Sequence, residues 1–232
     1  SSPYAGTGWT STGSSHSEQH LGATVCVRTD NGGRYYNARD VLIAFRGTVR
    51  NSEWVADADM RHTTATAGGH SLGTTHNGFW TLFNEIYTGG QGSNTMEIFL
   101  RNYRPSRVFL TGHSLGGAMC HLATLVIPNT VGCPVTTCSY AAPRVSADSA
   151  LDASYQAQIN SGDITHFVRI VNRQDPVPMV PKGHGYHHPP SVKIDFSAFN
   201  SPETAHPHSM GLYKLYVTHS SNQLVYRRDD MA

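Results

Sequence analysis

The stretch VFLTGHSLGG, residues 108–117, contains the strongest structural signal in the sequence. Residues 108–111 are a short apolar run of the kind that forms a buried strand, and residues 118–127 are apolar and compatible with a helix. Between them lies a G-x-S-x-G pentapeptide, Gly112-His113-Ser114-Leu115-Gly116. In this context the pentapeptide predicts a sharp strand-to-helix turn, which holds the central serine in a strained backbone conformation and exposes its hydroxyl.

Ser114 is the candidate nucleophile of this turn. Glycines two residues before and after it let the chain pack where a Cβ atom would collide. The backbone N–H of Leu115 lies at the predicted N-terminus of the helix, where it can stabilise an oxyanion. The alternative is a serine in an ordinary glycine-rich turn, but the flanking strand and helix patterns favour the catalytic turn.

Outside this unit, apolar strand patterns alternate with helix-compatible segments. Strands are predicted at residues 23–29, 41–45, 136–141 and 165–171, and helices at 79–87, 93–103, 147–161 and 206–216. This alternation predicts an α/β fold with a mostly parallel sheet, in which the runs at 41–45 and 108–111 are buried on both faces. The length is enough for one domain. We expect residues 1–232 to form it, with the Ser-, Gly- and Thr-rich residues 1–19 as a loosely packed N-terminal arm.

Composition excludes several classes of protein. The formal net charge is +1, and no block of like charge argues for a nucleic-acid partner. No apolar run reaches the roughly 18 residues of a transmembrane helix, so any membrane contact is predicted to be peripheral. Ser1 is not an initiator Met and no signal-peptide pattern follows it, which indicates a mature or trimmed product.

The cysteines fit no close metal-binding pair; buried free thiols are favoured, and a Cys133–Cys138 disulfide is the alternative.

A nucleophilic serine of this kind needs an acid and a histidine, in the chain order serine, acid, histidine. Among the acidic residues after Ser114, only Asp175 directly follows an apolar strand pattern, in HFVRIVNRQDPVP. This position predicts a loop at the carboxyl end of a strand, where such sheets carry their chemistry. The alternative is a surface aspartate in an Asx-turn before Pro176.

The histidine is harder to choose, because the chain has 14 of them. Six follow Asp175: His184, His187, His188, His206, His208 and His219. The cluster at 184–188 suggests a metal site, but no carboxylate or cysteine has the usual spacing, so we predict no metal. His206 and His208 both precede the apolar segment MGLYKLY, and the pattern alone does not decide between them.

Four blocks of sequence together resemble the class 3, fungal-type triacylglycerol lipases. They are VLIAFRGTVRNSEWVAD at 41–57, HNGF at 76–79, LTGHSLGG at 110–117, and VNRQDPVP at 171–178 with GYHH at 185–188. The resemblance implies an α/β-hydrolase fold, with a mostly parallel central sheet flanked by helices and a short lid over the site. It also selects His208, because the family's catalytic histidine is typically followed five residues later by a tyrosine, here Tyr213.

By the same resemblance, Thr48 matches the family's oxyanion residue, with the Leu115 N–H as the second donor; a threonine at a strand end is the alternative. The segment after Thr48 matches the lid, and in it Val49, Trp54 and Val55 would contact the substrate. This segment is only moderately apolar, so a surface helix packed on the core is the alternative. The chain departs from the family in its short N-terminal part, its cysteine positions and the glycines before the nucleophile strand.

The implied function is hydrolysis of lipid esters through a Ser-His-Asp acyl-enzyme, with no cofactor. The expected partners are a lipid or other carboxylester substrate and a lipid–water interface, and the expected localisation is secreted. A soluble, feruloyl esterase-like enzyme and a phospholipase A1-type enzyme are the alternatives. The complete set of Ser114, Asp175, His208 and Thr48 disfavours a catalytically inactive lipid- or sugar-binding relative.

Overall fold

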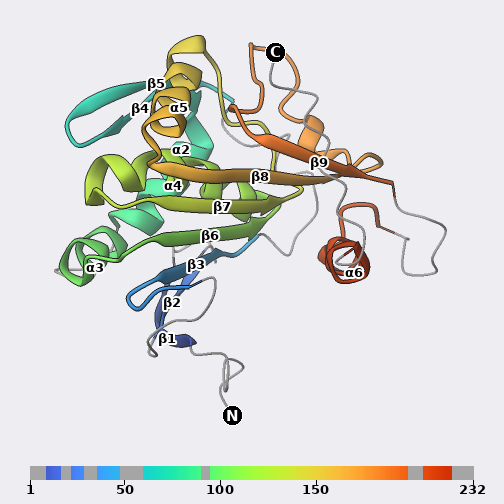
Figure 1. Ribbon diagram of the computed structural model, residues 1–232. Helices are drawn as coiled ribbons and strands as arrows, with labels where there is room; N and C mark the ends of the chain where they lie inside the picture. The colour runs from blue at the N-terminus through green and yellow to red at the C-terminus, as the bar shows by residue number, and fades with distance from the viewer. Residues whose placement is uncertain are drawn as a thin grey trace.

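The computed structural model describes residues 9–16, 22–28, 36–47, 60–89, 95–197 and 206–220. Its main element is a seven-stranded sheet in the order β1-β2-β3-β6-β7-β8-β9 (Figure 1). The parallel strands are β3 (Val41–Phe45), β6 (Val108–His113), β7 (Val135–Tyr140), β8 (Ile164–Asn172) and β9 (Val192–Phe196). An antiparallel edge is added by β1 (Trp9–His16) and β2 (Gly22–Arg28). The predicted α/β fold with a mostly parallel sheet is confirmed.

Two apolar clusters lie on opposite faces of this sheet. The larger cluster contains side chains of α2 (Asn77–Tyr87), α3 (Met96–Tyr103), α4 (Leu115–Val131) and α5 (Ser149–Ser161). The smaller cluster contains α6 (Met210–Ser220), which Figure 1 shows apart from the other helices. Val135 of β7 belongs to the larger cluster, and Cys138 and Tyr140 of the same strand belong to the smaller one. Side chains alternate along a strand, so the two clusters face opposite ways.

The same alternation corrects one expectation. The strands β3 and β6 were predicted to be buried on both faces, but only the face toward α4 is fully buried. Ile43 and Leu110 on that face are 0% and 2% exposed, whereas Leu42 and Phe109 on the other face are half-buried. The reason is that α6 packs against β7, β8 and β9 and meets β6 at its last residue, His113, so no described helix covers Leu42 and Phe109.

Several strands have little or no signal in the sequence. β4 (His62–Ala67) and β5 (His70–His76) form a two-stranded antiparallel sheet against α5, and their sequences, HTTATA and HSLGTTH, have too few apolar residues for a strand pattern. β1 lies inside the N-terminal arm, where periodicity is weak, and pairs with β2. In β9, by contrast, VKIDF alternates apolar and polar residues, a short signal that pattern analysis could have found.

The cysteines of the chain all fall within the described residues, and none of them forms a disulfide. The proposed Cys133–Cys138 disulfide therefore does not form. Cys133 lies just before β7 and Cys138 lies within it, so the extended strand carries Cys138 away from Cys133: three residue steps from Val135 to Cys138 already span about 10 Å, whereas a disulfide needs Cα atoms within about 7 Å.

An alanine at Gly112 should disturb the turn before Ser114. Its Cβ atom would lie 2.3 Å from the Gly116 carbonyl oxygen and 2.9 Å from Cys120 Sγ, closer than real contacts allow. We expect Gly112→Ala to lower the free energy of unfolding by about 1–3 kcal/mol, measured by urea denaturation. Gly211→Ala is the matched control: its Cβ atom would meet only Ser209 Oγ at 3.3 Å on an exposed helix, so stability should not fall. Equal effects of the two substitutions would contradict the prediction.

Candidate active site

The turn around Ser114 has the conformation that its sequence predicts. Ser114 lies between β6 and α4 with φ 59° and ψ −125°, a positive-φ conformation that is strained for a residue with a Cβ atom. Its N–H donates to the Tyr140 carbonyl at 3.0 Å, and its own carbonyl accepts the Gly117 N–H at 2.8 Å. A Cβ atom on Gly116 would be 2.3 Å from the Phe45 carbonyl oxygen, so only glycine allows this approach of α4 to β3.

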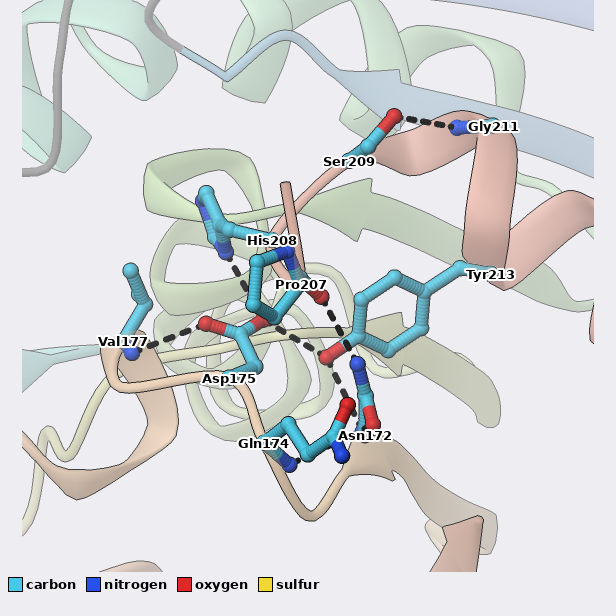
Figure 2. A network of polar contacts seen from close by, with 9 residues as sticks. All are labelled: Asn172, Gln174, Asp175, Val177, Pro207, His208, Ser209, Gly211 and Tyr213. Atoms are coloured by element: carbon cyan, nitrogen blue, oxygen red, sulfur yellow. Dashed lines mark hydrogen bonds and ion pairs between the residues drawn. The ribbon is translucent and has the colours of Figure 1, made fainter. Parts of the chain in front are cut away.

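Asp175 and His208 lie together beyond the carboxyl end of β8 (Figure 2). His208 Nδ1 donates to Asp175 Oδ2 at 2.8 Å; the carboxylate is fully buried, and the imidazole is 25% exposed. Asp175 Oδ1 accepts the Val177 N–H at 2.9 Å, which fixes the carboxylate in its loop. Because Nδ1 is the donor to Asp175, the neutral ring keeps a basic Nε2 for proton transfer.

Tyr213 completes the environment of the carboxylate. Its hydroxyl donates to Asp175 Oδ2 at 2.7 Å and accepts the Asn172 N–H at 3.0 Å. Burial, followed by the nearby Asp175 charge, raises the pKa of Tyr213 well above its usual range, so the phenol remains a donor. The Asn172 side chain donates to the Pro207 carbonyl at 2.9 Å and so joins the Asp175 loop to the segment that carries His208.

The roles of Tyr213 and Asn172 in this hydrogen-bond network were not predicted from the sequence. Sequence reasoning used Tyr213 only as a spacing marker for the histidine. It missed Asn172, for which the one available signal is its position at the end of the strand before Asp175.

The structure separates the two histidines that the pattern left undecided. His208 contacts Asp175, whereas His206 is exposed and its carbonyl accepts the Ser209 N–H in the turn before α6. The ring of His113, the residue before Ser114, lies 4.5 Å from the His208 ring between centroids, so the imidazole reaches the turn. Among the described residues no hydrogen bond joins the Ser114 hydroxyl to His208. Such contacts often tighten only when substrate binds.

The predicted oxyanion and lid residues are described only in part. Leu115 is the first residue of α4, so its N–H lies at a helix N-terminus, as expected. Thr48, Val49, Trp54 and Val55 lie outside the described residues, and their roles stay predictions. The chain just before Thr48 does contact the turn, because a Cβ atom on Gly47 would be 2.6 Å from the His113 carbonyl oxygen.

Two of the histidines at 184–188, His187 and His188, have protein partners. His187 Nε2 lies 2.6 Å from Asp152 Oδ2, and its Nδ1 lies 2.7 Å from the Gly185 carbonyl oxygen. Burial lowers the pKa of His187, but these two contacts outweigh it and hold the pKa above its ordinary value. His188 Nε2 contacts the Pro178 carbonyl at 2.8 Å. Within the described residues, no three His, Cys, Asp or Glu side chains are grouped in a way that could hold a metal ion.

Comparison with known proteins places the chain in a family. A model of the family described as Lipase (class 3) matches residues 42–184, more than half of the chain. The chain belongs to this family. Phospholipase A1-II 4 of Oryza sativa subsp. japonica is 30% identical over 178 residues, which are 68% of this chain and 44% of that protein. Phospholipase A1-IIgamma of Arabidopsis thaliana is 25% identical over 181 residues, 68% of this chain and 42% of that protein. The chain thus spans about half the length of the curated relatives it matches.

Solved lipase structures share the fold of this class 3 lipase chain. The Rhizomucor miehei lipase propeptide complex superimposes with a TM-score of 0.61 at 23% identity, covering 82% of this chain and 58% of that one. Lipase II from Rhizopus niveus gives a TM-score of 0.63 at 20% identity, covering 83% and 68%. The likeness establishes the α/β-hydrolase fold that the resemblance implied.

In this class 3 lipase chain, Tyr213→Phe should remove one hydrogen bond to the Asp175 carboxylate while keeping the aromatic ring in its place. A hydrogen bond to a charged group is worth about 1.5–3 kcal/mol, so we expect kcat on a dissolved short-chain ester to fall about ten- to a hundredfold, with KM nearly unchanged. The matched control is Tyr216→Phe on the same helix, because Tyr216 stacks on Phe196 with ring centroids 4.2 Å apart and does not contact Asp175. Equal rates for the two variants would show that the Tyr213 hydroxyl has no such role.

Proposed function

We propose that this chain is a serine carboxylester hydrolase acting on lipid esters, with Ser114, His208 and Asp175 as its catalytic triad. The observation that carries the proposal is the hydrogen bond from His208 Nδ1 to the buried Asp175 carboxylate, next to the strained turn of Ser114. A buried carboxylate that orients an imidazole, whose other nitrogen remains basic, is the arrangement that activates a serine hydroxyl. Membership of the class 3 lipase family supports the same activity.

The reaction follows from these positions. Ser114 Oγ attacks the ester carbonyl carbon while His208 Nε2 takes the hydroxyl proton, and Asp175 stabilises the resulting imidazolium. The carbonyl oxygen becomes an oxyanion, for which the N–H of Leu115 and the predicted donors of Thr48 are the stabilising groups. The imidazolium protonates the departing alcohol as the C–O bond breaks, which leaves an acyl group on Ser114. A water molecule, deprotonated by His208, then releases the carboxylic acid and restores the free serine.

Exposed apolar side chains near the triad support a lipid substrate. Met179 ends the short helix η1 (Val177–Met179) in the Asp175 loop, and Met210 begins α6 just after His208. Met179 and Met210 are 52% and 42% exposed, so each offers apolar surface beside a triad residue. Flexible methionine side chains suit acyl chains of varied shape. The predicted lid residues Val49 and Trp54 would extend this apolar surface.

Two classes of lipid compete as the substrate. We favour acylglycerols, as the resemblance to triacylglycerol lipases implies. The second candidate is a phospholipid, because the curated relatives named above are phospholipases A1. Assays of a triacylglycerol emulsion and of phosphatidylcholine vesicles, run side by side, separate the two; hydrolysis of the vesicles alone would replace the first candidate by the second.

The same features bear on the localisation of the enzyme. We propose a secreted enzyme that binds a lipid–water interface peripherally, on the strength of the family resemblance and of the exposed methionines Met179 and Met210. Among the described helices, none combines the length and the apolar character needed to cross a membrane.

Substitutions at the triad test the activity itself. Ser114→Ala and His208→Ala should each lower kcat/KM on a dissolved ester by several orders of magnitude, because each removes a group that acts only as part of the triad. A fluorophosphonate probe should label the parent at Ser114 and neither variant. His206→Ala is the control, since His206 is exposed and does not contact Asp175, and it should stay near the parent rate. If His206→Ala were the more damaging change, the assignment of the general base would be wrong.

A second set of assays tests the lid. Ser114 is only 3% exposed, which supports a lid that moves when an ester binds. A large apolar side chain that moves from the protein to the lipid contributes about 1.5–3 kcal/mol to opening, so Trp54→Ser should lower activity on emulsified long-chain esters about tenfold or more. Activity on dissolved short-chain esters should change far less. An equal loss on both substrates would favour a fixed wall at this segment and a soluble esterase.

A further inference from the structure

The ring of His113 lies against the candidate general base. The centroids of the His113 and His208 rings are 4.5 Å apart, and their planes are tilted by 33°. The Tyr213 ring, edge-on, lies 5.6 Å from His113. His113 occupies the first variable position of the G-x-S-x-G pentapeptide and directly precedes Ser114. The strained turn therefore also carries the ring against which His208 packs.

His208 needs such a surface because, among the described residues, one side-chain hydrogen bond restrains its ring. Its imidazole is 25% exposed and comes from the turn before α6 rather than from the sheet. Asp175 holds one edge of the ring through Nδ1, and a single hydrogen bond leaves the ring free to tilt. A catalytic imidazole must keep Nε2 aimed at the serine within a fraction of an ångström. The face of the His113 ring restrains the tilt that Asp175 does not.

We propose that His113 is a positioning residue for His208: its ring packs against the imidazole, while Asp175 holds the imidazole through Nδ1. This inference rests on the proposed triad and adds to it a residue that touches neither substrate nor the reacting atoms. The role belongs to the aromatic ring and not to its Nε2 atom, because no partner for the buried His113 Nε2 is found among the described residues. An aliphatic side chain would fill the space without the cost of that unpaired nitrogen.

The charge state of His113 fits this role. Burial, followed by the neighbouring His208, lowers the pKa of His113 to about 4, although the Asp175 charge and a hydrogen bond with the His208 backbone oppose the shift. His113 is therefore neutral at neutral pH, and its π-face does not repel the imidazolium that forms on His208 during the reaction. A neutral aromatic face beside a cation is weakly attractive, whereas a second charged ring would destabilise the same state.

Three variants test the proposal. His113→Ala removes the ring, His113→Phe keeps a ring without the hydrogen bond to the His208 backbone, and His166→Ala changes an exposed histidine on β8 as a control. We expect His113→Ala to lower kcat on a dissolved short-chain ester about ten- to a hundredfold, as a misplaced catalytic group does, with KM within twofold of the parent. His113→Phe should recover most of this loss, and His166→Ala should match the parent.

A second readout does not depend on activity. The proton between His208 Nδ1 and Asp175 Oδ2 is expected to give a far-downfield proton NMR resonance, as protons in short, charge-assisted hydrogen bonds do. This resonance should broaden or disappear in His113→Ala and persist in His113→Phe, with all variants folded by circular dichroism. A parent that shows the resonance but hydrolyses no ester would contradict the proposed function and not this inference. The inference would be overturned if His113→Ala kept both the resonance and a kcat within twofold of the parent, or if its loss appeared in KM instead.

Discussion

Backbone from three segments meets at the turn around Ser114, and this close approach positions the groups of the candidate site. A Cβ atom on Gly112 would collide with Gly116, and one on Gly116 would collide with Phe45. Only glycine lets the ends of β3 and β6 and the start of α4 come so near. The strained φ of Ser114 persists because α4 is buried along most of its length and cannot relax away from the sheet. The close approach of these backbone segments therefore accounts both for the strained φ of Ser114 and for the position of the Leu115 N–H.

The second constraint is the buried carboxylate of Asp175. A desolvated charge is stable only when donors replace the lost water, and Asp175 has three: His208 Nδ1, the Tyr213 hydroxyl and the Val177 N–H. The first comes from the turn before α6 and the second from α6 itself. The hydrogen bonds that satisfy the charge therefore also dock α6, where Tyr213 packs against Phe196. The candidate triad and the smaller apolar cluster form one structural unit.

The HNGF block (residues 76–79) and the GYHH block (residues 185–188) also carry the family resemblance, but they contribute packing and hydrogen bonds rather than triad residues. His76 caps α2 by accepting the Phe79 N–H, and its ring stacks on Phe79 and packs against Tyr186. The Tyr186 hydroxyl donates to the Met60 carbonyl at 2.8 Å. The HNGF and GYHH blocks thus meet each other, and the histidines that suggested a metal site hold loops together. His187 does so through Asp152, on α5.

The sequence by itself determined the parts of the site whose geometry is local. A strand, a turn and a helix that follow one another in residues 108–131 depend on neighbouring residues, so the pattern alone predicted the Ser114 turn, and it also placed Asp175 just beyond a strand. Periodicity could not choose between His206 and His208, and the family's spacing to Tyr213 selected His208; the tertiary structure shows the contact itself, because the turn before α6 brings His208 to Asp175 across 33 residues of chain. It alone also revealed the roles of Asn172 and His113 and the strands β4 and β5. These features depend on contacts between segments that are distant in the sequence. Residue periodicity reports only how one segment alternates between core and solvent, so it does not show which segments are in contact.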